Sequence, residues 1–345
     1  MKIKLLLILL IAITVIAAAK DDRAAYRIFN AKGKKVSYED LLKAAEGADI
    51  IFFGELHDNP ICHWLELRLT KDLYNMKKER LVLGAEMFER DNQLLLNEYI
   101  SKMIRKKDFE AEAKLWKNYQ TDYAPIVDFA VENKINFVAT SIPRRFAAIV
   151  NRSGFEGLDS INAVERGLIA PLPVKFNPEL DCYKKMKEMM GPDPAGSHMS
   201  DNIERAQAIK DATMAHFILK NGYEGRTFLH FNGSYHSDHH QGIVWYINYY
   251  NRKTEMNLKV VTISCVEQKS TANITDENLG VADFIICIPD DMTKTMAPSG
   301  GSAPSSSMKP ATTTTPAAPI VKHDSVTKPA ADTTDDDEGE EGDND

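Results

Sequence analysis

Six short apolar runs recur along the chain, and they predict a buried β-sheet. Each contains mostly apolar residues without regular polar alternation, which is typical of strands covered on both faces. The runs lie at residues 49–53, 80–85, 135–140, 226–231, 258–264 and 283–288. Amphipathic stretches of helical length lie between them at residues 63–78, 91–104, 125–134 and 202–222. Strands that alternate with helices predict an α/β fold, in which a mostly parallel sheet is flanked by helices.

Residues 154–200 interrupt this pattern. The stretch is rich in proline and glycine and contains no run that fits a buried strand. We therefore predict that it forms a helical insertion or lid rather than part of the sheet.

The amino-terminal 19 residues differ from the rest in composition. Two lysines, an apolar run and a small-residue end at Ala17-Ala18-Ala19 follow one another, which is the order of a secretory signal peptide. A transmembrane anchor is the alternative, but an apolar run of about 15 residues is short for a membrane span. No cysteine follows the run, so a lipoprotein anchor is not predicted. We expect an exported protein, periplasmic or secreted, with residues 20–292 as its folded domain.

The carboxyl-terminal residues 293–345 are rich in Pro, Ser, Thr and Ala and end in a block of acidic residues. Such a segment has too little apolar surface to offset its ordering entropy, so we predict that it is disordered. It carries ten acidic residues against four lysines, and thus most of the net charge of −8. The folded domain is close to neutral, which argues against a nucleic-acid-binding surface.

Several common motifs are absent from the sequence. The cysteines form no C-x-x-C pair, so neither a zinc ribbon nor covalent haem attachment is indicated, and we expect buried thiols. There is no G-x-S-x-G, no P-loop and no G-x-G-x-x-G. Serine hydrolase, nucleotide and dinucleotide chemistry therefore have no motif here.

Reactive side chains gather where the predicted strands end. The first and fourth strands both run into G-x-x-H, at Gly54 to His57 and at Gly233 to His236. The second strand runs into Glu86, and the third is followed by Arg144 and Arg145. Because the carboxyl ends of parallel strands meet at one edge of a sheet, we expect a ligand site there.

The residue types at this edge suit two kinds of chemistry. Imidazole and carboxylate groups bind divalent metals, so His57, Glu86 and His236 are candidate ligands of manganese, zinc or cobalt. In a hydrolase of this kind, Glu55 or Glu86 is the candidate general base. Each of these residues also has a simpler explanation. A single G-x-x-H can arise by chance, and Glu86 could be a charge at a helix N-terminus, where the helix dipole favours it. The two arginines could be surface charges on a helix that begins after Pro143.

Aromatic residues in the stretch WKNYQTDY raise a similar choice. Trp116, Tyr119 and Tyr123 have helical spacing, which usually indicates packing. The same residues could form the wall of a site for a flat ligand, with a tyrosine on iron.

Five stretches together resemble the ChaN-like haem-binding family of the Tiki/TraB superfamily, which is related to erythromycin-esterase-like proteins. They are FFGELHDNPICHWLELRL, VLGAEMFERDNQLLLNEYI, LWKNYQTDYAPIVDFAVENKINFVATSIPRR, QAIKDATMAHFI and LHFNGSYHSDHHQGI. The resemblance covers residues 48–243 in the order of the family.

The resemblance implies an exported haem-binding protein of haem or iron uptake, with haem as cofactor and with a homodimer and a haem-uptake machinery as partners. The residues to which it points are Gly54, Glu55, His57, Glu86, Met87, Pro143, Arg144, Asp211, Met214, Gly233 and His236. Tyr235 and the pair His239 and His240 depart from the usual pattern of the later loop, so Tyr119, Tyr123 and Tyr235 stand beside the histidines as candidate iron ligands.

Three hypotheses arise from the sequence. The first is a haem-binding module, with an arginine on a haem propionate. The second is a metal-dependent hydrolase that uses the two G-x-x-H histidines and a glutamate. The third is a scaffold without chemistry whose acidic tail is the working part.

Overall fold

The computed structural model describes residues 24–190, 202–222 and 225–296. The predicted signal peptide, part of the 154–200 stretch and residues 297–345 of the predicted tail lie outside these ranges. No helix in the described ranges is both long and apolar enough to span a bilayer.

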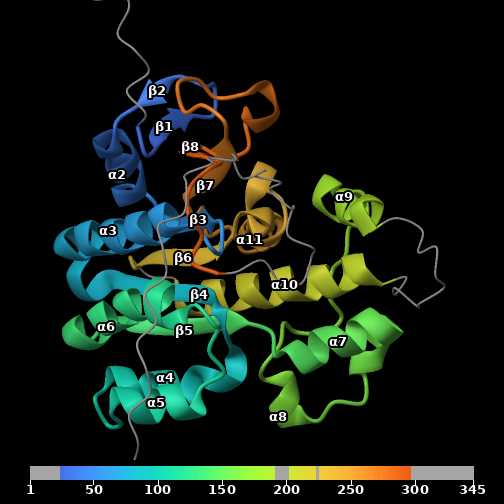
Figure 1. Ribbon diagram of the computed structural model, residues 1–345. Coiled ribbons are helices and arrows are strands. Elements are labelled where there is room, and N and C mark those ends of the chain that lie inside the picture. The colour runs from blue at the N-terminus through green and yellow to red at the C-terminus, as the bar shows by residue number, and fades with distance from the viewer. Residues whose placement is uncertain (1–23, 191–201, 223–224, 297–345) are drawn as a thin grey trace, which may run out of the picture. The chain divides into compact units, whose positions relative to one another are not determined.

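An eight-stranded sheet forms the centre of the domain, in the order β2-β1-β8-β7-β3-β6-β4-β5 (Figure 1). Its strands are β1 (Arg27–Asn30), β2 (Lys35–Val36), β3 (Ile50–Glu55), β4 (Leu81–Glu89), β5 (Asn136–Ser141), β6 (Thr227–Gly233), β7 (Val260–Gln268) and β8 (Phe284–Pro289). Strands β3 to β8 pair in parallel, and β1 pairs antiparallel with β2 and β8. The six predicted strands and the mostly parallel sheet are confirmed.

Helices cover both faces of the sheet. They are α2 (Tyr38–Glu46), α3 (Pro60–Lys77), α4 (Gln93–Ile100), α5 (Lys106–Glu112), α6 (Ala124–Asn133), α7 (Arg144–Ser153), α8 (Ala163–Arg166), α9 (Asp181–Met190), α10 (Ile203–Asn221) and α11 (Ile243–Thr254). Helices α2 to α6 pack on one face, and α7, α10 and α11 pack on the other. The four predicted helices correspond to α3, α4, α6 and α10.

Strand β3 shows why the apolar runs do not alternate. Ile51 and Phe53 face the α3 and α6 side, whereas Ile50 and Phe52 face the α10 side, and all four are buried. Both faces of a central strand are therefore apolar, as the parallel arrangement requires.

The loop after β3 is fixed by the start of α3. Asn59 is the N-cap, and its side-chain oxygen accepts hydrogen bonds from the amides of Ile61 and Cys62. Pro60 occupies the first turn, where its missing N–H is not needed. The cap lies two residues after His57, so it holds the G-x-x-H stretch at the carboxyl edge of the sheet.

The predicted insertion contains no strand within its described part, residues 154–190. It consists of a short 3₁₀ turn, α8 and α9, joined by segments without regular secondary structure. The chain then enters α10, which begins at Ile203 and lies beside α7.

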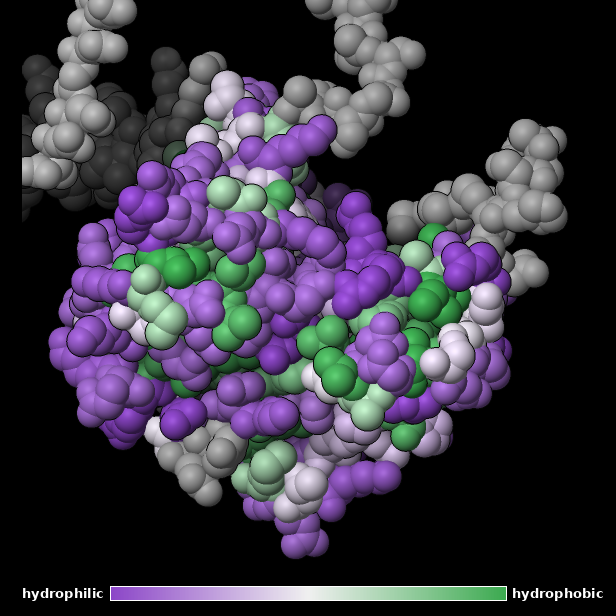
Figure 2. All heavy atoms as spheres, turned by 90° about the horizontal axis from the view of Figure 1, so that it is seen from below, coloured by the Kyte–Doolittle hydropathy of each residue, from purple (hydrophilic) through white to green (hydrophobic). Residues whose placement is uncertain are grey.

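Exposed apolar side chains occur on the opposite side from β1 and β2. Figure 2 views the molecule from the side of α4, α5, α7 and α8 and shows two hydrophobic areas on a mostly hydrophilic surface. Leu94 in α4, Met103 after it and Val164 in α8 are 68%, 75% and 80% exposed. The cysteines, by contrast, are buried free thiols, as predicted.

Candidate ligand-binding cleft

His57 lies two residues beyond the end of β3 and is held by a buried carboxylate. Its Nδ1 is 2.7 Å from Oε1 of Glu55, which is 1% exposed. Burial opposes the charge on His57, but the hydrogen bond to Glu55 and the charge attraction of Glu86 and Glu55 together outweigh it and raise the pKa of His57. With Nδ1 engaged in this way, Nε2 is the ring nitrogen left for a ligand or a proton.

Residues of the WKNYQTDY stretch support this pair from behind. The Tyr123 hydroxyl donates to Oε1 of Glu55 at 2.7 Å, and the Asn118 amide donates to the carbonyl of His57 at 2.8 Å. The ring of Trp116 contacts the His57 ring edge-on, with centroids 4.9 Å apart. Residues 116–123, of which Tyr119–Tyr123 form a π-helical turn, therefore hold the pair of His57 and Glu55 in position.

Glu86 reaches the same point from β4. The register of β4 against β5 is irregular between Ala85 and Glu89, and such irregularities redirect side chains. Oε2 of Glu86 accepts a hydrogen bond from the amide of Gly233 at 2.8 Å. A Cβ atom on Gly233 would lie 2.7 Å from Nε2 of His57, so this position needs a glycine for the close approach of the imidazole.

His236 is clamped between two acidic residues. Its Nδ1 is 2.5 Å from Oδ1 of Asp211 in α10, and its Nε2 is 3.2 Å from Oε1 of Glu86. Burial opposes the imidazolium, but attraction to Glu86 and Asp211 outweighs it and raises the pKa of His236 to about 10. His236 is therefore a positively charged imidazolium at neutral pH, with a proton on each ring nitrogen.

The clamp has further partners. Tyr183 of α9 donates a hydrogen bond to Oδ2 of Asp211 at 2.8 Å, which joins the insertion to the site. The Gln207 amide lies 3.1 Å from Nδ1 of His236. Burial opposes the charge of Glu86, yet His236 holds the pKa of that carboxyl well below its usual range.

Stability is expected to fall as the pH rises above neutral. A histidine with a raised pKa in the folded state stabilises the fold fully below its unfolded pKa of about 6.5, and this contribution is lost as the pH approaches 10. Urea unfolding at pH 7 and pH 9.5 measures the loss. In a His236→Gln variant the difference between the two pH values should be smaller; an equal difference would contradict the charge assigned to His236.

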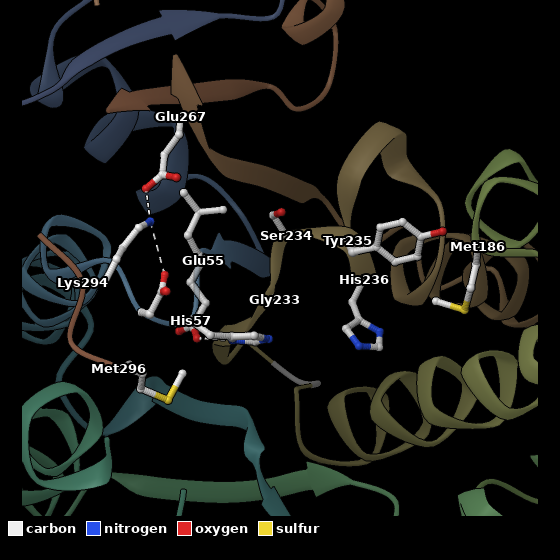
Figure 3. Close-up of a pocket in the computed structure, with 12 residues that line it drawn as sticks. Glu55, His57, Met186, Gly233, Ser234, Tyr235, His236, Glu267, Lys294 and Met296 are labelled. Carbon is white, nitrogen blue, oxygen red and sulfur yellow. Dashed lines mark hydrogen bonds and ion pairs between the residues drawn. The ribbon is translucent and has the colours of Figure 1, made fainter. Parts of the chain in front are cut away.

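A cleft of about 610 Å³ opens over these residues. Figure 3 shows His57 and His236 on either side of Gly233, with Tyr235 and Met186 at one end. At the other end, Lys294 forms ion pairs with Asp58 and Glu267, and Met296 lies beside His57. The volume is in the range of small-molecule and cofactor sites.

A second hollow of about 390 Å³ adjoins the first, because Met186 lines both. Glu86, Trp116 and Gln207 lie on its wall, together with Arg144 of α7 and Lys210 of α10. Neither cation forms an ion pair within the described ranges. Arg145, by contrast, is paired with Asp91 at 2.5 Å and does not line the hollow.

The first residues of the predicted tail belong to the wall of the cleft. The Thr295 amide donates to the carbonyl of Asp58 at 2.9 Å, and its hydroxyl donates to Asp122 at 2.6 Å. Lys294, Thr295 and Met296 thus contact the domain beyond the predicted boundary at residue 292.

The structure brings together most of the residues that the sequence singled out. Gly54, Glu55, His57, Glu86, Arg144, Gly233, Tyr235 and His236 lie in or beside the two hollows, and Asp211 contacts His236. Two tyrosines do not line the cleft. Tyr119 is buried against Phe88 and Phe109, and Tyr123 lies behind Glu55.

Several contributors were not predicted. From helices come Gln207, Lys210 and Met186, which line the hollows, Tyr183, which bonds to Asp211, and His63 and Glu66, which lie beside Glu55. His63 and Glu66 are three residues apart at the start of α3, and this spacing places them on one helical face. That signal was available in the sequence, whereas the contribution of Tyr183 depends on how the insertion packs.

The fold and the cleft define an α/β protein with a cleft at the carboxyl edge of a mostly parallel sheet. The chain belongs to the haem-binding uptake family ChaN of the Tiki superfamily, whose sequence model matches residues 41–247.

A comparison with one solved structure supports the fold. A structure described as cofacial haem binding to ChaN of Campylobacter jejuni is 19% identical, with a TM-score of 0.56, and the match covers 76% of this chain and 96% of that one. An erythromycin esterase mutant in its open conformation is 11% identical over 77% of this chain and 98% of its own, but its TM-score of 0.43 is too low to support an inference. No curated protein matched the chain.

Proposed function

We propose that this protein binds haem in the cleft at the carboxyl ends of β3 and β6, with Nε2 of His57 as the iron ligand. The observation that carries the proposal is the pair of His57 and Glu55, in which Nδ1 is 2.7 Å from a buried carboxylate oxygen. A histidine that binds a metal through one nitrogen commonly gives the other to a carboxylate, which fixes the ring and raises its basicity.

The other candidate ligands of the cleft are engaged. His236 is held between Asp211 and Glu86 and is protonated, so its nitrogens are donors. The Tyr235 hydroxyl donates to the carbonyl of Cys182, and burial raises the pKa of Tyr235 to about 12. Neither group presents a free electron pair to a ligand in the way that Nε2 of His57 does.

The walls of the cleft suit a flat apolar group with anionic ends. Trp116, Met186 and Met296 supply apolar contact surface, and Arg144 and Lys210 supply two cations. Haem is a planar ring with two propionates, and its iron is the Lewis acid that an imidazole binds.

Removing the cations is expected to weaken haem binding moderately. Arg144→Ala and Lys210→Ala should each lower affinity by up to about fivefold at low salt, because an exposed ion pair contributes about 0.2–1 kcal/mol. The effect should shrink at high salt. Hemin titrations at two ionic strengths measure it, with Arg145→Ala as the matched control, since Arg145 is paired with Asp91. An equal loss in the control would exclude a specific role for Arg144 and Lys210.

The direct test of the function is an absorbance titration of the purified protein with hemin. A saturable Soret shift at one haem or fewer per chain is expected. A flat titration under conditions where the protein is folded would refute the proposal. Export, a part in haem uptake and a homodimer extend it, and they stay predictions of the family resemblance and of the amino-terminal sequence.

Ester hydrolysis is a second candidate function, and the same pair supports it. A histidine oriented by a buried carboxylate is also the arrangement of a general base, with Nε2 directed at the cleft. Glu86 is less suited to this part, because it already accepts from Gly233 and contacts His236. This candidate requires two results. The purified protein must hydrolyse an ester without showing a Soret shift, and the hydrolysis must be lost in His57→Ala.

A further inference from the structure

Next to His57 lies a second cluster of ligand-type side chains, of which Glu55 lines the cleft and the other two, His63 and Glu66, do not. Glu55, His63 and Glu66 each offer one ligand atom, and these atoms lie within 4.8 Å of one another. All three side chains are at least 95% buried, with exposed fractions of 1%, 5% and 0%. The cluster is separate from the set of His57, Glu86 and His236 that the sequence suggested for a metal.

The ring of His63 lies among four acceptor oxygens. Its Nε2 is 3.2 Å from the carbonyl of His57 and 3.5 Å from Oδ2 of Asp122, and its Nδ1 is 3.0 Å from Oε2 of Glu66 and 3.7 Å from Oε2 of Glu55. In the tautomer with the proton on Nε2, the lone pair of Nδ1 faces the two carboxylates. In addition, Oε2 of Glu55 and Oε1 of Glu66 are buried without a hydrogen-bond partner among the residues that the structure describes.

Such an arrangement needs a positive charge. Two carboxylates in a dry interior repel each other strongly, and a lone unpaired buried carboxylate oxygen is costly. Protonation of His63 compensates one of the two charges at most. A divalent cation between the three groups compensates both and gives the orphan oxygens a partner.

The spacing also fits a metal. Oxygen and nitrogen ligands lie about 2.0–2.2 Å from Zn²⁺ and similar ions, so two ligands on one ion are about 3–3.6 Å apart. The separations of 3.0 and 3.7 Å from Nδ1 are close to this range. The surroundings hold the ligands in place: Tyr123 donates to the other oxygen of Glu55, and Nε2 of His63 is fixed on a backbone carbonyl.

We propose that Glu55, His63 and Glu66 form a binding site for a divalent transition-metal ion in the interior of the domain. Two carboxylates and one imidazole suit Mn²⁺, Fe²⁺ or Zn²⁺. Glu55 then connects two sites, since Oε1 bonds to His57 of the cleft and Oε2 faces the metal. The competing arrangement is a single proton shared by Glu55 and Glu66.

The test is metal binding by the full-length protein. Chelator-treated protein is dialysed against Mn²⁺ or Zn²⁺, and bound metal is measured by elemental analysis beside the melting temperature. We expect about one ion per chain and a higher melting temperature with metal. Glu66→Gln keeps the side-chain size and should weaken binding at least about tenfold, because loss of even an outer partner of a metal ligand costs 10–100-fold.

Glu86→Gln is the matched control, since Glu86 belongs to the cleft and not to this cluster. Retention of the ion in Glu86→Gln and its loss in Glu66→Gln support the interior site, and the reverse result overturns it. Absence of metal uptake, with Glu66→Gln at least as stable as the unaltered protein, also overturns it in favour of the shared proton. If Glu66→Gln does not fold, His63→Gln serves in its place. A hemin titration of the same samples measures haem binding separately, so failure of the metal site can be told apart from failure of the proposed function.

Discussion

Replacing His57 with alanine is expected to abolish the Soret shift of the haem complex or to move it to that of weakly bound hemin. Mutation of a residue that hydrogen-bonds to a metal ligand typically lowers affinity by about 10–100-fold. The imidazole of His57 is the ligand itself, so its removal should lower haem affinity by more than this. The fold should persist, because His57 lies in a loop held by the Asn59 cap and its side chain is 37% exposed. Hemin titration followed at the Soret band, with circular dichroism as a check of folding, makes the measurement.

Tyr119→Phe is the matched control for this prediction. Its hydroxyl is buried in the core, has no hydrogen-bond partner in the described part of the chain and does not line the cleft, so its removal should leave the spectrum and the affinity unchanged. An unaltered spectrum in His57→Ala would contradict the ligand assignment. The ligand would then have to be another group of the cleft, and Tyr235→Phe would test the first of these.

Replacing His236 with alanine is expected to destabilise the fold by about 3–5 kcal/mol, which is typical when one partner of a buried ion pair is removed. The reason is the charge that remains. Asp211, whose side chain is 1% exposed, and Glu86, whose side chain is 13% exposed, both contact the imidazole, and without it the two carboxylates face each other with no cation between them. Urea unfolding at pH 7 measures the change in the free energy of unfolding.

His240→Ala provides the comparison at the surface. His240 also pairs with an acid, Asp283, at 3.3 Å, but its side chain is 42% exposed. Solvent screens such a pair, so the loss should be about 0–1 kcal/mol. Equal effects of the two substitutions would mean that the clamp around His236 does not hold a buried charge.

The central strands were predictable because their burial on both faces produces a continuous apolar run in the sequence. Each central strand is covered on both faces, so the run from Ile50 to Phe53 is apolar throughout and is recognisable without any knowledge of its neighbours. Edge strands give a weaker signal in the sequence, because they are short. Strand β1 has four residues and β2 has two, and neither run is long enough to indicate a strand.

The candidate site was predictable where its residues follow a strand directly. Glu55, His57, Glu86, Gly233 and His236 all come at the ends of apolar runs, and parallel pairing brings those ends to one edge. Tyr119 shows the limit of such reasoning. Its spacing from Tyr123 and Trp116 fits either a ligand wall or a packed face, and the structure buries it in the core.

The sequence by itself determined the α/β architecture, the family and the edge of the sheet where the chemistry gathers, because these depend on local apolar runs and on the residues directly after each run. Only the tertiary structure decided the partner of each group. It placed Asp211 and Glu86 on opposite sides of His236, gave Nδ1 of His57 to Glu55, and closed His63 and Glu66 around the other oxygen of that carboxylate. Apart from the pair of His57 and Glu55, which are two residues apart, these contacts join residues on different elements, and their distances depend on how the helices pack on the sheet.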